Sequence, residues 1–290
     1  MSTRNFDKEY ETLKVIGKGY FGTVSLRKQK STGNVYACKE SNLSACKTEQ
    51  QKQLFITEAA VMKDLDSTGI VQHIDQYFDQ ANQKLYIVME YCDDCNLTQY
   101  VIRQKEQNAF VPEAFVWHVA HQLLQGLDYL HNHARKDEII VHRDLSPNNV
   151  FLSKNGDARM GDFGFTKTLK RDGSWLKLEA FEYAYASIVP PHHQPPELLT
   201  NQPYNEKADI WSLGTCIYEL ITHRTITVVH KTLPDLINEI NECRILKIPS
   251  HYSNQLQSFV DELLKYDLNK RLSAKELLIK FQDQLNSSQK

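Results

Sequence analysis

The chain has 290 residues, 41% of them hydrophobic, and a formal net charge of −2 at pH 7. Such a length and composition allow a large buried core, and chains of this size usually divide into two lobes. The near-neutral charge gives no general attraction to nucleic acid or to an anionic membrane. No apolar run approaches the roughly 18 residues of a membrane span, so we expect neither partner.

The first residues, Met1 to Asn5, contain neither the apolar segment of a secretion signal nor a glycine for myristoylation. The six cysteines are spread along the chain without the spacing of a disulfide framework. Cys92 and Cys95 have CxxC spacing, but no second pair of cysteines or histidines completes a zinc site. We therefore expect a protein of the reducing cytoplasm.

The first motif is a glycine-rich run, GKGYFG, at residues 17–22. One apolar run ends at Ile16 and another begins at Val24, which predicts two strands joined by a tight turn. Glycine in such a turn lets backbone N–H groups approach phosphate oxygens. Dinucleotide-binding proteins share this spacing, but they need a helix after the third glycine and an acidic residue about 20 positions later. The turn signal at residues 31–34 favours a hairpin instead.

A third strand and a helix follow this hairpin. Residues 35–39, VYACK, predict a strand that ends in Lys39, from which an amine can reach the α and β phosphates of a nucleotide. Residues 48–65 carry apolar side chains at helical spacing and place Glu58 on the face that could meet Lys39. Taken alone, such a pair is usually a solvated surface Glu and Lys. We predict an ion pair here because further motifs follow in register.

Two longer segments complete the pattern. Residues 112–133 begin with a proline and predict a buried helix with apolar positions at Phe115, Val119, Leu123, Leu124, Leu127 and Leu130. Between His142 and Gly164 the chain reads HRDLSPNNVFLSKNGDARMGDFG, which contains Asp144, Asn149 and Asp162.

These motifs, in this order, resemble the eukaryotic protein kinase superfamily from Tyr10 to about Phe281. Three segments look similar to the NIMA-related (Nek) serine/threonine kinases: YIVMEYC at 86–92, NVFL at 149–152 and YNEKADIWSLG at 204–214. The resemblance implies an α+β, two-lobed protein kinase fold in a single domain. It places a small β-rich lobe with one regulatory helix at residues 1–91 and a larger, mainly α-helical lobe at residues 92–290.

The resemblance also implies a serine/threonine protein kinase that uses ATP and Mg. Asp144 would receive or orient the substrate hydroxyl, Asn149 and Asp162 would bind the metal, and Lys39 paired with Glu58 would hold the phosphates. ATP is expected in the cleft between the lobes. The remaining expected nucleotide contacts come from the glycine-rich run, the apolar residues around the adenine and the segment that joins the lobes: Ile16, Gly17, Lys18, Gly19, Tyr20, Phe21, Gly22, Val24, Ala37, Met89, Glu90, Cys92 and Phe151.

Two supporting contacts are implied in the larger lobe. Asp209 should accept hydrogen bonds from the backbone of the catalytic loop that contains Asp144, and Glu197 should pair with Arg271. The segment from Asp162 to Glu197, which we call segment 162–197, carries hydroxyl side chains that we consider as phosphorylation sites. They are Ser174, Tyr183, Tyr185 and Ser187, and Arg143 is the cation that a phosphate there would engage.

Two positions depart from the family pattern. Ser146 stands where serine/threonine kinases have a lysine that contacts the γ-phosphate, and Asn148 stands where some tyrosine kinases have an arginine. Alignment back from Glu197 places Pro190 where Nek kinases have a threonine bonded to the catalytic Asp and to that lysine. Removing one preorganised contact typically costs about 10²- to 10³-fold in rate. We therefore expect reduced rather than absent activity.

Two functions remain open: a serine/threonine kinase with reduced activity, and an ATP-binding pseudokinase that acts as a signalling scaffold. The joint retention of Lys39, Glu58, Asp144, Asn149 and Asp162 favours the kinase, because a scaffold has no evident need for Asp144. We expect the partner to be a protein substrate with serine or threonine hydroxyls. The expected location is the cytoplasm, with or without attachment to the cytoskeleton.

Overall fold

The computed structural model describes residues 6–19, 22–178, 191–226, 233–241 and 247–287. The chain divides into two compact units, unit 1 with residues 1–66 and 71–93 and unit 2 with residues 67–70 and 94–290. A five-stranded antiparallel sheet in unit 1 and a helical unit 2 confirm the expected α+β, two-lobed architecture. The exact lobe boundary between residues 91 and 92 stays a prediction. In the part of the chain that is described, no helix is long and apolar enough to span a membrane.

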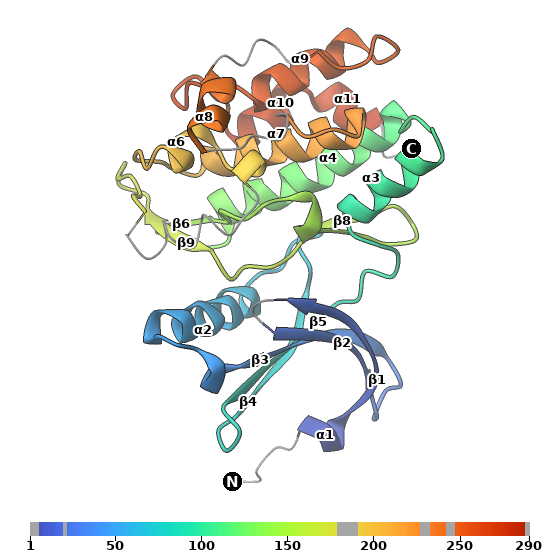
Figure 1. The fold of residues 1–290 in the computed structure, drawn as a ribbon, viewed down its shortest axis with the longest axis vertical. Coiled ribbons are helices and arrows are strands. Elements are labelled where there is room, and N and C mark those ends of the chain that lie inside the picture. The colour runs from blue at the N-terminus through green and yellow to red at the C-terminus, as the bar shows by residue number, and fades with distance from the viewer. Residues whose placement is uncertain (1–5, 20–21, 179–190, 227–232, 242–246, 288–290) are drawn as a thin grey trace. The chain divides into compact units, whose positions relative to one another are not determined.

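Unit 1 is built around its sheet, in which the strands lie in the order β1-β2-β3-β5-β4. Its helices and strands (Figure 1) are α1 Phe6–Glu9, β1 Tyr10–Gly19, β2 Gly22–Gln29, β3 Val35–Asn42, α2 Glu49–Lys63, β4 His73–Asp79 and β5 Lys84–Met89.

The register of the sheet assigns each residue to one of two faces. Val24 of β2 lies opposite Lys39 of β3, and Ala37 of β3 lies opposite Met89 of β5. Residues directly opposite each other share a face, and residues two apart on one strand also do. Val24, Ala37, Lys39 and Met89 therefore lie on the same face of the sheet.

The other face of the sheet carries an apolar cluster. Cys38 lies opposite Val88 on this face, and both are fully buried. Phe6 of α1 completes the cluster, because its ring lies 4.3 Å from that of Tyr86 and 4.9 Å from that of Tyr10. The short helix α1 thus covers this face and leaves the face with Lys39 to the site described below.

Helix α2 begins where the side chain of Thr48 accepts a hydrogen bond from the backbone N–H of Gln51 at 3.2 Å. This is the N-terminal cap expected for Ser, Thr, Asp or Asn. Its buried residues are Phe55, Glu58, Ala59, Val61 and Met62. The helix predicted over residues 48–65 is confirmed.

Unit 2 is mainly helical and also contains two small antiparallel sheets, β6 with β9 and β7 with β8. Its elements are α3 Leu97–Glu106, α4 Glu113–Asp128, β6 Glu138–Val141, β7 Val150–Leu152, β8 Ala158–Met160, β9 Lys167–Lys170, α6 Pro196–Leu199, α7 Lys207–Thr222, α8 Leu233–Asn241, α9 Asn254–Leu263, α10 Ala274–Lys280 and α11 Gln282–Ser287.

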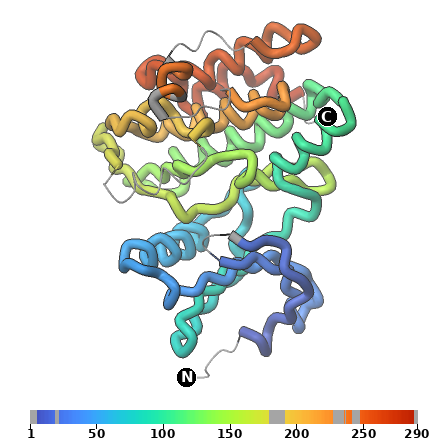
Figure 2. Tube along the Cα trace, viewed as in Figure 1, coloured from blue at the N-terminus to red at the C-terminus, as the bar shows by residue number. Residues whose placement is uncertain are grey.

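Helices α4 and α7 form the core of unit 2. The helix predicted over residues 112–133 is confirmed as α4, with Pro112 at its N-terminal cap, but its last turn, Tyr129–His133, is a π-helix. Leu123, Leu124 and Leu127 are fully buried, as are most residues of α7. Helix α4 contacts α7, α10 and α11, and the tube in Figure 2 lets these segments be followed from green to red.

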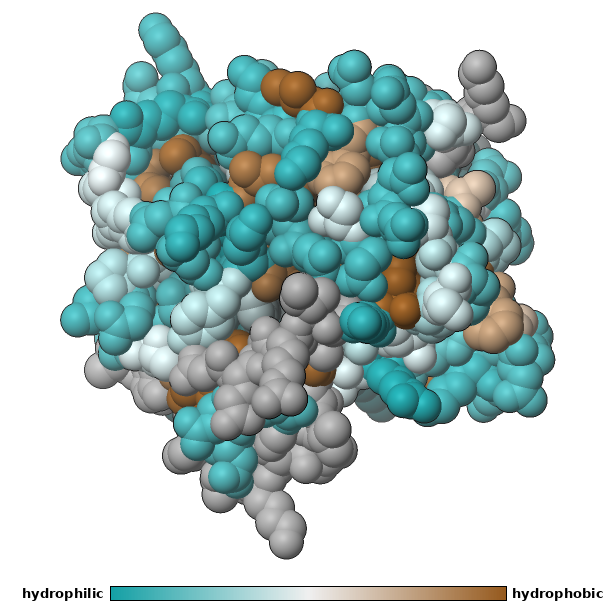
Figure 3. All heavy atoms as spheres, turned by 90° about the horizontal axis from the view of Figure 1, so that it is seen from above, coloured by the Kyte–Doolittle hydropathy of each residue, from teal (hydrophilic) through white to brown (hydrophobic). Residues whose placement is uncertain are grey.

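The surface seen in Figure 3 is mostly hydrophilic, and the hydrophobic residues that reach it stand as separate spots. Ile279 of α10, which is 62% exposed, is one of the apolar side chains that unit 2 presents to solvent. Single exposed apolar residues of this kind are normal for a folded protein.

Candidate active site

The glycine-rich run forms a β-hairpin in unit 1. Gly17 lies opposite Val24, and Gly19 lies opposite Gly22. Ile16 is the extra residue of a β-bulge in β1. The strand that follows the run excludes the dinucleotide-binding alternative, which needs a helix there. The predicted contacts Tyr20 and Phe21 lie outside the described residues.

Gly22 occupies a position that only glycine fits. Its φ is +150°, and a Cβ added to it would overlap the backbone carbonyl of Glu40. At Gly17 an added Cβ would make only an ordinary contact, 3.7 Å from the Cβ of Val24. The two glycines are therefore not equivalent. The fold of the sheet requires glycine at position 22, whereas position 17 has space for a residue with a Cβ.

The predicted ion pair between Lys39 and Glu58 is confirmed. The amine Nζ of Lys39 donates to both carboxylate oxygens of Glu58, at 2.7 and 2.9 Å. The two side chains are only 10% and 2% exposed, so the alternative of a solvated surface pair is excluded. The pair joins strand β3 to helix α2 and fixes the amine on the face of the sheet that also carries Val24, Ala37 and Met89.

At the end of β5, the backbone N–H of Glu90 donates to the carbonyl of Gln72 at 2.9 Å. A contact from Glu90 to an adenine would therefore have to use its carbonyl oxygen. Ile16, Lys18 and Cys92 lie in unit 1 as well, and Phe151 lies on β7 of unit 2. The nucleotide-binding role of all these residues stays a prediction.

In unit 2, Asp209 organises the loop over residues 142–149, which we call loop 142–149. Its carboxylate accepts the backbone N–H groups of His142 and Arg143, each at 2.9 Å, and Nε2 of His131 lies 2.9 Å away. Complete burial by itself raises the pKa of Asp209, but these hydrogen bonds more than offset it, so its pKa lies below the usual value. The predicted role of Asp209 is confirmed.

His142 joins loop 142–149 to the start of segment 162–197. Its Nδ1 accepts the backbone N–H of Asp144 at 3.3 Å, and its Nε2 lies 3.2 Å from the carbonyl of Gly161. The ring also packs against Phe163, with 4.9 Å between centroids. Nδ1 accepts and Nε2 donates, which is the hydrogen-bond pattern of a neutral ring. Burial favours the same neutral form, because it lowers the pKa of His142.

Asp144 and Asn149 are brought together directly. The amide Nδ2 of Asn149 donates to the carboxylate Oδ2 of Asp144 at 2.9 Å and to its carbonyl at 2.8 Å. Arg143 and Asp162 adopt left-handed backbone conformations, with φ of 66° and 62°. Such conformations cost about 1–3 kcal/mol in non-glycine residues and concentrate at functional sites.

The side chains proposed to bind magnesium fit that ion chemically. Asn149 offers its amide oxygen Oδ1, which has no hydrogen-bond partner among the described residues, and Asp162 offers a carboxylate. Mg²⁺ prefers oxygen ligands, and it commonly takes one or two from the protein and the rest from water and phosphate. The described residues contain no cluster of three His, Cys, Asp or Glu that could hold a metal by itself.

Of the two positions that depart from the family pattern, the structure describes Ser146. Ser146 is 4% exposed, and its carbonyl accepts the backbone N–H of Asn149 at 2.9 Å, which closes the short 3-10 turn at Pro147–Asn149. Asn148 in that turn is exposed. Pro190, like Tyr183, Tyr185 and Ser187, lies outside the described residues.

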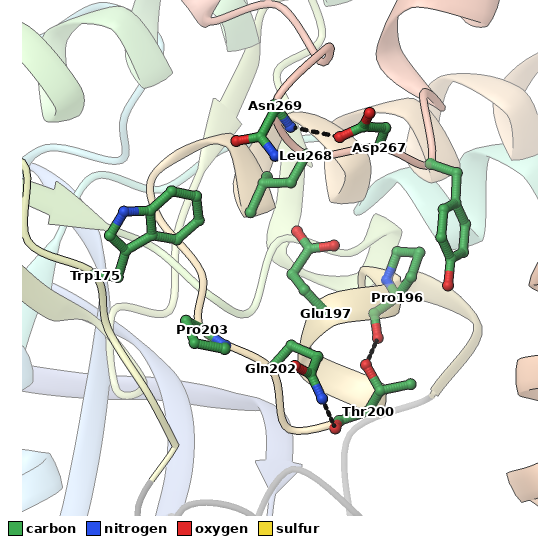
Figure 4. A pocket seen from close by; sticks show the side chains of 10 residues that line it. Trp175, Pro196, Glu197, Thr200, Gln202, Pro203, Asp267, Leu268 and Asn269 are labelled. Carbon is green, nitrogen blue, oxygen red and sulfur yellow. Dashed lines mark hydrogen bonds between the residues drawn. The ribbon is translucent and has the colours of Figure 1, made fainter.

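The predicted pairing of Glu197 with Arg271 is confirmed, with N to O distances of 2.7 and 3.2 Å. Arg271 is fully buried and also donates to the carbonyls of Lys207, Lys265 and Tyr266. Glu197 lines a pocket of about 880 Å³. Figure 4 shows Glu197 among the lining side chains, with Trp175 on one side. None of the residues assigned to phosphate transfer lines this pocket.

His131 is a residue of the proposed site that sequence reasoning missed. It lies four residues after Leu127 and seven after Leu124, so it falls on the apolar face of the predicted helix. It is 2% exposed and contacts Asp209. A polar side chain on an otherwise apolar helix face needs a buried partner, and that signal was available in the sequence.

Comparison with known proteins agrees with this geometry. The family model described as "Protein kinase domain" matches residues 10–280. The chain is 33% identical over 270 residues to "Probable serine/threonine-protein kinase nek2" of Dictyostelium discoideum, covering 93% of this chain and 62% of that protein. It is 32% identical over 271 residues to "Serine/threonine-protein kinase Nek2" of Homo sapiens, covering 93% and 59%.

A third relative is "Serine/threonine-protein kinase Nek5" of Mus musculus, which is 34% identical over 270 residues, or 93% of this chain and 39% of that protein. The chain thus spans less than two thirds of the length of each of these relatives. The match of the family model covers nearly the whole chain, and the chain belongs to the protein kinase family, with Nek serine/threonine kinases among its relatives.

Proposed function

We propose that this chain transfers the γ-phosphoryl group of ATP to serine or threonine hydroxyls of a protein substrate. The observation that carries the proposal is the orientation of Asp144, whose carboxylate is held by Asn149 at 2.9 Å. The Nek relatives, which are named serine/threonine-protein kinases, support the substrate class. The absence of an arginine at Asn148 also favours serine and threonine over tyrosine.

In the proposed reaction, Asp144 orients the substrate hydroxyl and accepts its proton as the new bond to the γ-phosphorus forms. The bond from the γ-phosphorus to the bridging β,γ oxygen breaks, and ADP leaves. Lys39, fixed by Glu58, holds the α and β phosphates. Asn149 and Asp162 would hold Mg²⁺, which would offset the negative charge of the phosphates.

The proposed adenine contacts are apolar side chains. They are Val24, Ala37 and Met89, which share one sheet face in unit 1, and Phe151. The carbonyl of Glu90 and the backbone N–H of Cys92 would contact the polar edge of the base.

A cytoplasmic location, with or without attachment to the cytoskeleton, belongs to the same proposal. The described cysteines form no disulfide among themselves, which suits a reducing compartment.

An ATP-binding scaffold is the second candidate, and Ser146 favours it. The side chain at this position is a short hydroxyl, 4% exposed, in place of a long cation. Without that cation, charge that develops on the γ-phosphoryl group loses one stabilising contact. The loss of one contact lowers the rate without abolishing transfer, so we place the chain among kinases of reduced rate and keep the scaffold as the alternative.

The decisive experiment incubates the purified chain with Mg·ATP and a serine/threonine peptide array, beside an Asp144→Asn variant. The kinase proposal expects transfer by the wild type and a rate lower by about 10²-fold or more in the variant, which has lost the proton acceptor. ATP binding without transfer by the wild type would favour the scaffold. Equal transfer by both proteins would remove Asp144 from the mechanism.

A further inference from the structure

Two of the acceptors that the guanidinium of Arg143 contacts are neutral and lie among the described residues. Its Nε donates to the carbonyl of Phe165 at 2.6 Å, and its Nη1 donates to the hydroxyl of Tyr204 at 2.9 Å. Phe165 follows directly on the Asp162–Gly164 motif, and Arg143 directly precedes Asp144. The guanidinium therefore connects the residue beside the proposed proton acceptor to segment 162–197.

Packing and backbone hydrogen bonds hold Tyr204 in place independently of its bond to Arg143. Its side chain is fully buried in a cluster formed by Val141, Leu169, Leu178, Leu198, Tyr204 and Ala208. Its backbone exchanges two hydrogen bonds with Leu176, each of 2.9 Å. One residue thus joins loop 142–149, the first half of segment 162–197 and the loop that leads into α7.

A fixed acceptor opposite a cation makes a stronger hydrogen bond than a neutral pair does, and more so away from water. The left-handed backbone of Arg143, with φ of 66°, also needs contacts that hold it in place. Asp209 supplies one such contact to its backbone, and Phe165 and Tyr204 supply two to its side chain.

We propose that Tyr204 is a positioning residue for phosphate transfer. Its hydroxyl holds Arg143, and through Arg143 it holds Asp144 and residues 165–176 in the working arrangement before any phosphate is added to segment 162–197. The proposal rests on the kinase function proposed above.

The test compares two variants that each lose one buried phenol hydroxyl from unit 2. Tyr204→Phe removes the bond to Arg143 and keeps the ring. The matched control is Tyr252→Phe, since Tyr252 is also buried and donates to the carbonyl of Val111 at 2.8 Å. Both proteins and the wild type are treated with phosphatase, and mass spectrometry verifies that no phosphate remains.

With Mg·ATP and a serine/threonine peptide, we expect kcat to fall about tenfold or more in Tyr204→Phe, because a hydrogen bond to a charged group is lost. The KM for ATP should stay within about twofold, since Tyr204 is assigned no nucleotide contact, and Tyr252→Phe should retain the wild-type kcat. A kcat of Tyr204→Phe that equals that of the control would overturn the proposal.

A double-mutant cycle with Arg143→Lys tests whether Tyr204 acts through the arginine. Lysine cannot reach both acceptors as the planar guanidinium does. If the proposal is right, adding Tyr204→Phe to Arg143→Lys lowers kcat little further. Fully additive losses would show that Tyr204 acts by another route.

A third measurement does not depend on activity. Amide hydrogen exchange of peptides covering residues 142–149 and 165–178 should quicken about tenfold in Tyr204→Phe and not in Tyr252→Phe. Unchanged exchange in both regions would refute the positioning role. A wild type that transfers no phosphate would refute the kinase function alone, because the exchange comparison would still decide the role of Tyr204.

Discussion

Buried charged side chains form the framework of the proposed site at the scale of single residues. Lys39 and Glu58 neutralise each other in unit 1, and the charge of Asp209 is stabilised by hydrogen-bond donors in unit 2. Removing one partner from such a set leaves a buried charge without compensation, which costs more than the pair itself contributes. These residues should therefore affect stability as well as transfer.

We predict that Lys39→Met abolishes detectable transfer and also destabilises the chain by about 3–5 kcal/mol, because Glu58 is left buried without its cation. Lys39→Met combined with Glu58→Leu should regain much of that stability without regaining transfer. Urea unfolding and single-turnover phosphate transfer are the measurements.

The matched control for this prediction is Lys84→Met. Lys84 also forms an ion pair on the same sheet, with Glu40 at 2.7 Å, but its side chain is 36% exposed. Its replacement should change stability by about 1 kcal/mol or less. A similar loss in both methionine variants would contradict the assignment of Lys39 to a buried pair.

Asp209→Asn should reduce stability at neutral pH by about 2–4 kcal/mol, because an amide cannot accept from all the donors that face the carboxylate. The pKa of Asp209 is lower in the folded chain than in the unfolded one, so its contribution is complete above the ordinary Asp value of about 3.9 and disappears as the pH falls through the folded pKa.

The measurement is the difference in urea midpoint between wild type and Asp209→Asn at a series of pH values. The difference should be constant above about pH 5 and shrink only below about pH 4. A difference that already narrows between pH 7 and 5 would assign the linkage to another group.

At the scale of elements, Gly17 and Gly22 of the hairpin β1–β2 differ in whether a larger residue could replace them. Gly22 lies where the returning strand passes the backbone of Glu40, whereas Gly17 faces only the side chain of Val24. A close approach of two backbones cannot be relieved by a rotamer change, so the position rather than the motif decides the cost of a substitution.

Gly22→Ala should therefore lower the free energy of unfolding by about 1–3 kcal/mol, since alanine at a φ of +150° is strained and its Cβ has no space. Gly17→Ala is the matched control and should change stability by less than about 1 kcal/mol. Denaturant unfolding of both variants is the measurement, and equal losses would contradict the distinction between the two positions.

At the scale of the whole molecule, binding of Mg·ATP should raise the stability of the folded chain. If Mg·ATP binds only the native chain, a concentration of one hundred times Kd adds about 2.7 kcal/mol of stability. A thermal-shift titration should show this rise in the presence of Mg²⁺.

The control for this titration is Asp162→Asn. Asparagine tolerates the left-handed backbone found at this position, with φ of 62°, so the substitution removes the charge and leaves the local fold. The stabilisation by Mg·ATP should then be reduced. No rise with the wild type would remove both the kinase and the ATP-binding scaffold from consideration.

Local patterns in the sequence were sufficient to predict the hairpin and helices α2 and α4, and to single out the motif residues whose roles at the proposed site stay predictions. Each of these depends on the spacing of residues within one segment: apolar positions three and four apart, glycines at a turn, or a motif such as that around Asp144. The ion pair of Lys39 with Glu58 was also predictable, because the family resemblance specifies which strand and which helix meet.

Tertiary structure alone decided the contacts of His131 with Asp209 and of Tyr204 with the loops. His131 and Asp209 are 78 residues apart in the chain, and Arg143 and Tyr204 are 61 apart. No periodicity within one segment encodes such contacts, because they arise only when the buried helices α4 and α7 have packed and fixed the loops beside them. The same holds for Leu176 and Tyr204, whose pairing depends on backbone atoms that every residue shares.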